Sequence, residues 1–205
     1  MSAQLIISVG REFGSGGHTV ASTLAQRFSL PFYDENMLQT IAERRGVSPE
    51  GLEPYDETPK APLLYRTVNG FSNAPSDALA RMQFQFLREQ AEAGRSFVVL
   101  GRCADGILKD FPGLVSIFVL ADPDFKLART IARGAASREE ALSLMAARDR
   151  KRKTYHNQYC QGKWGDSRTY DLTVKSSRLG IPATVDLLEQ YIRARMLCDG
   201  LTIQA

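Results

Sequence analysis

The sequence predicts an α/β fold in which buried strands alternate with helices. Short apolar runs rich in branched residues, which are typical of buried strands, recur along the chain. The segments between them carry apolar residues at helical spacing and begin with helix-capping residues. At 205 residues the chain is long enough for one sizeable domain, and we expect residues 1–205 to form it.

The first strand and the helix after it frame a glycine-rich loop. The apolar run Leu5–Val9 stops at Gly10, and a helix is expected over residues 19–28. Four glycines in the eight positions from Gly10 to Gly17 permit backbone angles that other residues avoid. Strand, loop and helix together cradle phosphate, because backbone N–H groups converge there and the helix N-terminus adds positive potential. The alternative is a glycine-rich turn in a generic α/β domain.

The loop departs from the pattern G-x-x-x-x-G-K-[ST] in two ways. Gly17 stands where the pattern has lysine, and the loop counted from Gly10 is one residue longer than usual. We still expect the loop to hold the phosphates of a nucleotide. The residues expected to bind them are Gly10, Gly14, Ser15, Gly16, Gly17, His18 and Thr19.

Further strands and helices follow in alternation. Asp122 and Pro123 mark a helix start, because an acid suits the N-cap and proline suits the first turn. Ser137 followed by Glu140 has the spacing of a capping box and opens another helix. Strands are expected at residues 30–34, 97–100, 115–120 and 170–174. Helices are also expected at residues 35–45, 77–94 and about 182–196.

Residues 46–76 interrupt this alternation. They contain five prolines and show no clean periodicity. A connection of this length is by base rates either functional or disordered. We expect it to form an excursion on the substrate side of the fold.

Two polar residues stand at the ends of expected strands, where ligands bind in open α/β sheets. Asp34 follows the second strand and either contacts a ligand or caps the next helix. Arg102 follows the strand at residues 97–100 and is well placed for a bidentate grip on a phosphate or for a contact to a base. The alternative for Arg102 is a surface arginine that covers a helix end.

A basic run lies late in the chain. Five of the six residues from Arg148 to Lys153 are basic, and Arg148 and Arg152 lie on one helical face at i, i+4. Such a run is either a solvated face or a surface that receives an anion, since its charges repel one another unless an anion binds.

Composition limits the class of protein. The hydrophobic content of 43% and the charged content of 24% are ordinary for a globular chain, and the net charge of +3 does not argue for a nucleic-acid partner. Cys103, Cys160 and Cys198 are odd in number and lack C-x-x-C spacing, which disfavours both a disulfide framework and a zinc site. No apolar run approaches the roughly 18 residues of a membrane span. We expect a soluble cytoplasmic protein without a membrane partner, and the oligomeric state stays open.

Together, several motifs in this order resemble the cytidylate kinase-like family, the divergent relatives of bacterial cytidylate kinase. They are Ser8–Gly17, Phe32–Asp34, Gly101-Arg102, Arg148–Arg152 and Trp164–Ser177. The resemblance implies a P-loop kinase fold of the nucleoside monophosphate kinase type. That fold has three α/β/α layers, a parallel five-stranded sheet and a helical lid, here at about residues 137–168. It also implies ATP with Mg²⁺ as the phosphoryl donor.

The resemblance further implies roles for individual residues. Asp34, Arg102 and Asp171 hold the monophosphate substrate, and Thr19, with Ser15, lies near Mg²⁺. The counterparts of Arg148, Arg150 and Arg152 form the closing lid of that family, so these three are expected to be catalytic. Arg11 lies within the loop, and from that place we expect it to be a fourth catalytic arginine that replaces the missing lysine. Cytidylate kinases also carry an arginine shortly after the second-strand acid, where this chain has Met37-Leu38-Gln39. Its replacement comes from Arg44, Arg66 or Arg81, or the substrate differs.

The expected function is ATP-dependent phosphoryl transfer to a nucleoside monophosphate, with CMP or another pyrimidine monophosphate as the small-molecule substrate. Two alternatives stay open. One is a P-loop kinase with a non-nucleotide acceptor. The other is a nucleotide-binding sensor that no longer catalyses, although binding alone hardly requires a closing arginine lid.

Overall fold

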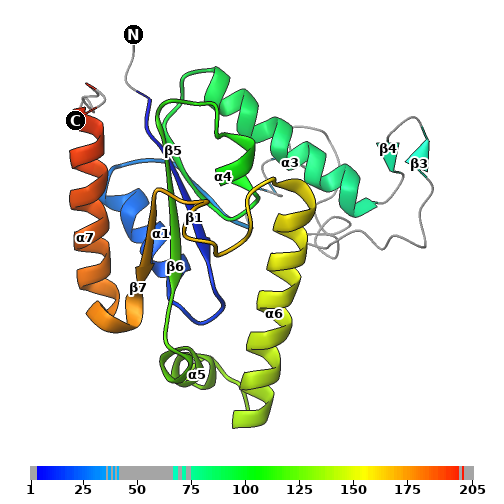
Figure 1. Ribbon diagram of the computed structural model, residues 1–205, viewed down its shortest axis with the longest axis vertical. Helices are drawn as coiled ribbons and strands as arrows, with labels where there is room; N and C mark the ends of the chain where they lie inside the picture. The colour runs from blue at the N-terminus through cyan, green and yellow to red at the C-terminus, as the bar shows by residue number, and fades with distance from the viewer. Residues whose placement is uncertain are drawn as a thin grey trace.

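The computed structural model describes residues 4–35, 37, 39, 41, 67–68, 71–72, 75–198 and 200. Within them, five parallel strands form one sheet in the order β2-β5-β1-β6-β7 (Figure 1). The strands are β1 (Ile6–Arg11), β2 (Phe32–Tyr33), β5 (Phe97–Leu100), β6 (Leu114–Leu120) and β7 (Leu172–Lys175). Helices cover both faces, so the predicted three-layer α/β/α fold is confirmed.

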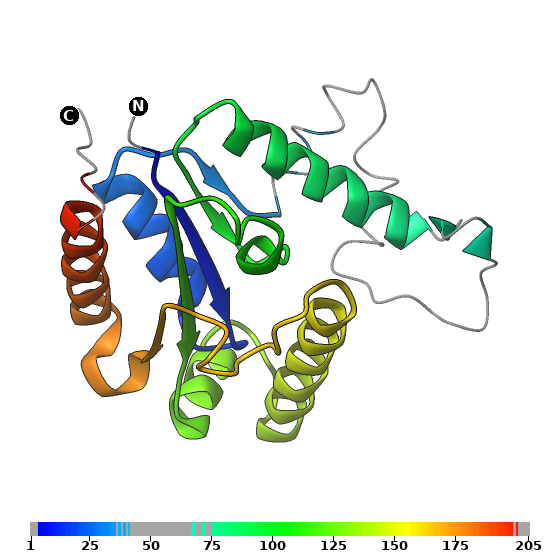
Figure 2. The same cartoon turned by 45° about the horizontal axis from the view of Figure 1, so that its top comes forward.

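The two faces of the sheet have separate cores because successive side chains of a strand point to opposite sides. Ile7 and Val9 pack with α1 (Gly17–Arg27) and α7 (Ser176–Cys198). Ile6 packs on the other side with α3 (Pro75–Glu92) and α4 (Ala104–Ile107). Figure 2 shows α1 and α7 together on one side of the sheet and α3 and α4 on the other. A strand buried on both faces reads as a continuous apolar run, which is why β1 was predictable.

Two further helices follow β6. They are α5 (Pro123–Ile131) and α6 (Arg138–Tyr159), which occupies the region expected to be a lid. The Ser137 hydroxyl accepts a hydrogen bond from the Glu140 N–H at 3.1 Å, so the predicted N-cap is confirmed. At the other end of α6 the Tyr159 hydroxyl donates to an Asp77 carboxylate oxygen at 2.9 Å. α6 therefore reaches from α5 to α3, opposite α7 in Figure 1.

Several element boundaries differ from those predicted. α7 begins at Ser176 rather than near Pro182 and is broken at Gly180, which has φ 74° and ψ 163°. Asp122 is the N-cap of α5 but makes no side-chain capping bond there, because its carboxylate accepts from Lys175 and Ser177 instead.

Parts of two predicted segments lie outside the described residues. Met37, Gln39 and Ile41 are helical, as expected for the helix at 35–45. Within residues 46–76 the structure describes the antiparallel pair β3 (Thr67–Val68) and β4 (Phe71–Ser72) and the start of α3. Arg44 and Arg66 are not among the described residues. No helix in the described part of the chain is both long and apolar enough to cross a bilayer.

Candidate active site

The glycine-rich loop connects β1 to α1 and has the backbone of a phosphate cradle. Gly14 and Gly16 have φ values of 79° and 84°, a region that L-residues rarely adopt. Added β-carbons would also meet close neighbours, the Lys126 carbonyl oxygen at 2.9 Å from Gly14 and the Ile181 Cδ1 at 2.6 Å from Gly16. The first turn of α1 follows directly, so the loop leads into the positive end of a helix, whose first N–H groups have no partner within the helix.

Side chains within and around the loop hold it in place. The Ser15 hydroxyl donates to the Glu12 carbonyl at 2.8 Å and accepts from the Gly17 N–H at 3.3 Å. The Ser176 hydroxyl, at the start of α7, donates to the Ser15 carbonyl at 2.6 Å. Ser15 is fully buried, and its hydroxyl holds the loop through these bonds, while its expected contact with Mg²⁺ stays a prediction.

Gly10 belongs to strand β1 and lines the pocket described below, and its contact with phosphate stays a prediction. An added β-carbon would lie 2.8 Å from Cδ2 of Phe118, so Gly10 is needed for close packing. Because β1 extends to Arg11, the loop has the usual length when counted from Arg11. Arg11 takes the position of the first motif glycine, Gly17 that of lysine, and His18 that of serine or threonine.

The two unusual positions of the loop touch each other. A β-carbon on Gly17 would overlap the Cβ of Arg11. Arg11 therefore fills the space that the first atoms of a lysine side chain at position 17 need. The loop thus has a basic residue at position 11 and none at position 17.

Arg11 lines a pocket where the carboxyl ends of β1 and β5 face α6. The pocket is small, with about 20 Å³ open to the centre of a water-sized sphere. Three arginines from separate elements, Arg11, Arg102 and Arg152, contribute to its wall. The remaining lining residues are Gly10, Gly101, Cys103, Asp105, Tyr155, His156, Trp164 and Tyr170. Three cations around one small pocket suit a phosphate group.

Arg102 enters this pocket from a strained turn after β5. Gly101, Arg102 and Cys103 have φ values of 75°, 58° and 57°, so three successive residues are left-handed. The left-handed conformation costs a non-glycine residue roughly 1–2 kcal/mol. Arg102 is also only 3% exposed. Strain of this kind at a buried arginine is typical of functional sites.

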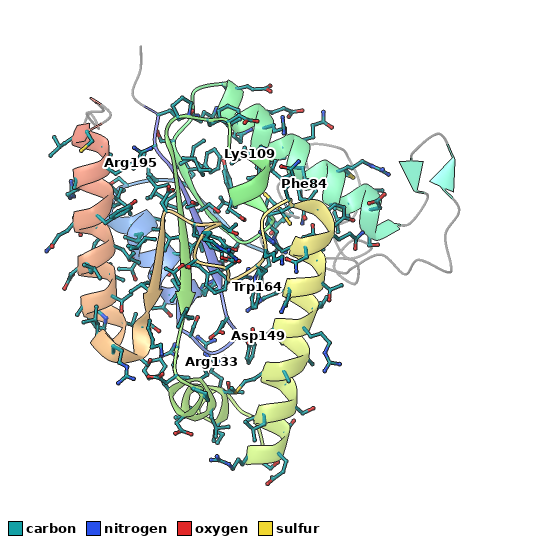
Figure 3. The ribbon with its side chains drawn as sticks, in the orientation of Figure 1. Phe84, Lys109, Arg133, Asp149, Trp164 and Arg195 are labelled. Carbon is teal, nitrogen blue, oxygen red and sulfur yellow. The ribbon has the colours of Figure 1, made fainter. Side chains whose placement is uncertain are left out.

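α6 contacts the phosphate loop through an acid within its basic run. Asp149, labelled in Figure 3, accepts a hydrogen bond from the Phe13 N–H at 2.6 Å. Its carboxylate lies 3.5 Å from Lys126 Nζ, which also pairs with Glu12 at 3.0 Å. Burial raises the pKa of Asp149, although the Phe13 hydrogen bond and Lys126 oppose the shift. The Arg152 guanidinium carbon lies 5.8 Å from the centroid of the Phe13 ring.

Comparison with known proteins assigns the chain to a family. The model of the cytidylate kinase-like family matches residues 6–178.

The chain belongs to the cytidylate kinase-like family.

Individual proteins are similar to this chain in sequence or in fold. A cytidylate kinase from Methanococcus maripaludis is 25% identical over 193 residues, which are 92% of this chain and 97% of that protein. The crystal structure of an uncharacterized protein from Eubacterium ventriosum is 37% identical, with a TM-score of 0.74 over 93% of this chain and 99% of that chain. Shikimate kinase from Bacteroides thetaiotaomicron shares the fold, with 14% identity and a TM-score of 0.54 over 92% and 98% of the two chains. The family supports a kinase of a nucleotide or another small molecule.

Among the three lid arginines expected for this family, Arg152 lines the pocket. Arg148 and Arg150 are exposed on α6 and lie outside the pocket-lining residues. Arg81, one of the suggested replacements for the missing substrate arginine, pairs with Asp77 at 3.1 Å. Neither Arg81 nor Asp77 belongs to the pocket wall.

The two acids expected to hold substrate differ in placement. Asp34 is buried, and its carboxylate lies 3.1 Å from Nε2 of His18 at the start of α1. Asp171 is exposed and uses one carboxylate oxygen to accept from the Ser116 N–H at 2.7 Å and from the Ser116 hydroxyl at 2.8 Å. Asp171 thus joins β7 to β6, and the preceding residue, Tyr170, reaches the pocket instead.

Arg129 of α5 is a loop-side cation that sequence reasoning missed. A β-carbon on Gly16 would lie 3.7 Å from its guanidinium carbon. Burial, and then the neighbouring Arg133, lower the pKa of Arg129. Nothing in the sequence distinguished it from the polar face of an ordinary amphipathic helix. Asp149 was missed for a similar reason, since it looked like a single acid within a basic run.

Proposed function

We propose that the protein transfers the γ-phosphoryl group of ATP to a nucleoside monophosphate, with CMP preferred over UMP and dCMP. The observation that carries the proposal is the convergence of Arg11, Arg102 and Arg152 on one pocket beside the glycine-rich loop. The relative from Methanococcus maripaludis, whose name is cytidylate kinase, supports the choice of acceptor.

The described residues fit the phosphates of ATP. The first turn of α1 offers backbone N–H groups that have no partner within the helix, and Gly17 has no side chain to obstruct them. Arg129 lies beside Gly16 and does not line the pocket formed by Arg11, Arg102 and Arg152, which we call the arginine pocket. We therefore assign Arg129 to the donor nucleotide.

Few side chains near the loop are available to bind Mg²⁺. Ser15 is committed to the loop itself, and His18 occupies the usual serine or threonine position. Thr19 is partly exposed at the start of α1 and is the hydroxyl that we assign to the metal. Mg²⁺ requires few protein ligands because it keeps waters and phosphate oxygens. When bound, it neutralises charge on the transferring phosphates.

The residues of the chain then act by positioning and by charge. Arg102, held in its strained turn, binds the acceptor phosphate. Arg11 and Arg152 stabilise the charge that develops on the transferred group. An oxygen of the acceptor phosphate is already a competent nucleophile, so the reaction needs no general base. Trp164 and Tyr170 line the pocket and reduce the access of water.

A coupled assay of ADP release across nucleoside monophosphates and small hydroxyl acceptors tests the proposal. We expect turnover with pyrimidine monophosphates, and we expect Arg102→Ala to raise the KM for the acceptor more than the KM for ATP. Turnover of a hydroxyl acceptor with none of the monophosphates would contradict the proposal. Shikimate belongs in the panel because shikimate kinases share the fold.

A sensor that binds ATP without turnover is the second candidate, and the glycine at position 17 favours it. The arginine at position 11 weighs against it, because it returns a cation to the loop. Tight ATP binding in a thermal-shift assay, with no ADP release for any acceptor, would favour the sensor.

A further inference from the structure

Three metal-binding side chains meet at the wall of the arginine pocket. Asp105 lies in α4, His156 in the last turn of α6, and Cys160 is the C-cap of α6. One donor atom from each lies within 4.8 Å of the other two. His156 and Cys160 are four residues apart, so a helical backbone places them on one side of α6. The cluster therefore combines two neighbours on one helix end with one residue from another helix.

The cluster is enclosed. The Asp105 and His156 side chains are each 6% exposed, and their Oδ2 and Nε2 atoms are 2.7 Å apart. Cys160 packs against Gly106, where an added β-carbon would lie 2.6 Å from Sγ. A glycine at position 106 thus leaves room for the sulfur beside Asp105.

The chemistry of the cluster suits a cation. The Asp105 carboxylate is the acid among the pocket-lining residues, where Arg11, Arg102 and Arg152 are the arginines. Zinc takes thiolate and neutral imidazole as ligands, so it would bind in place of the protons on Cys160 and His156.

We propose that Asp105, His156 and Cys160 bind one Zn²⁺ ion. Thiolate, imidazole and carboxylate are the ligand types that zinc accepts, whereas Mg²⁺ prefers oxygen ligands alone. Three protein ligands leave one tetrahedral position open, and Asp105 and His156 both line the pocket. The site is distinct from the Mg²⁺ site of the loop, and the proposal does not depend on the kinase reaction.

Cobalt reports on this site directly, because Co²⁺ bound to a thiolate shows a near-ultraviolet charge-transfer absorption that other ligands do not produce. The full chain is reduced, freed of metal with a chelator and titrated with Co²⁺ in the absence of nucleotide. We expect the absorption to saturate at one equivalent and to disappear when Zn²⁺ is added. Absence of the absorption would overturn the proposal and would favour a metal-free hydrogen-bonded cluster.

Variants identify the ligands. Cys160→Ser should abolish the absorption, and Asp105→Asn and His156→Gln should each weaken binding at least as much as loss of an outer-shell partner, about 10- to 100-fold. Matched controls are Cys198→Ser and His18→Asn, which change an exposed cysteine and the other histidine of the chain. Both controls should leave the absorption unchanged. An absorption that survives Cys160→Ser would overturn the proposal.

Native mass spectrometry of the unaltered chain provides an independent reading that does not depend on the folding of variants. After exposure to Zn²⁺ and removal of excess metal, we expect one zinc ion per chain. A chain that retains none would also overturn the proposal.

Discussion

Arg11 and Gly17 share one volume between β1 and α1, so each position restricts the other. We predict that Gly17→Lys alone destabilises the protein by about 1–3 kcal/mol through overpacking and lowers kcat/KM. The double variant Arg11→Gly/Gly17→Lys rebuilds the common loop pattern and should recover both stability and activity relative to Gly17→Lys. Thermal melts and ADP-release kinetics of the parent, the single variant and the double variant measure the two effects. A single Gly17→Lys variant as stable and active as the parent would show that the two side chains do not compete.

Arg11 and Arg152 reach the same pocket from different supports, a strand and a helix. Arg11→Ala should weaken ATP binding and turnover together, with a loss of about 10²–10³ in kcat/KM. Arg152→Ala should act mainly on kcat, as expected for a group that contributes in the transition state. Lys153→Ala, exposed on the same helix, is the matched control for Arg152. Full activity in both arginine variants would mean that the charge comes from elsewhere.

The backbone strain at position 102 and the role of the Arg102 guanidinium can be measured separately. Arg102→Gly and Arg102→Ala both remove the guanidinium, but only glycine tolerates φ 58° without cost. We predict that the glycine variant is more stable than the alanine variant by about 1–2 kcal/mol. Both should bind the acceptor equally poorly. Urea unfolding measures the difference, and equal stability of the two variants would show that position 102 is unstrained.

At the scale of elements, α6 is tied to the phosphate loop by Asp149. Burial raises the pKa of Asp149, so the charged form is disfavoured in the folded state. Its contribution to stability is therefore largest below the unfolded pKa of about 3.9 and is lost as pH rises through the higher folded value.

Asp149→Asn removes this titration and retains an acceptor for the Phe13 N–H. We predict that the free energy of unfolding of this variant, relative to the parent, increases as pH rises from the unfolded pKa of Asp149, about 3.9, through its higher folded pKa. Urea unfolding of both proteins at a series of pH values from about 4 upward measures it. A difference that does not change with pH would contradict the prediction.

At the scale of the whole molecule, the loop is bonded to α5 and α6 through Lys126 and Asp149 and to α7 through Ser176. We therefore propose that residues 1–205 unfold as one domain. ATP at about 100 times its dissociation constant should stabilise the folded state by roughly 2.7 kcal/mol and shift the entire transition. Differential scanning calorimetry with and without ATP measures both effects. Two separate transitions, of which ATP shifts only one, would contradict a single domain.

The sequence by itself determined the features that depend on residues close together along the chain. A strand buried on both faces is mostly apolar, so Leu5–Val9 was recognisable as a buried strand. The capping residue Ser137 and the arginine at the end of β5 were also readable, because each depends on neighbours within a few positions. The order of these motifs was enough to identify the family and its fold.

Only the tertiary structure decided which distant side chains meet. Asp149 bonds to Phe13 across 136 positions, and Asp105 meets His156 across 51. The spacing of the cysteines argued against a zinc site, but that argument considers only ligands that are close in sequence. The packing of α4 against the end of α6 brings Asp105 to His156 and Cys160. Helix packing depends on side chains throughout the core, so no local pattern around these residues encodes their meeting.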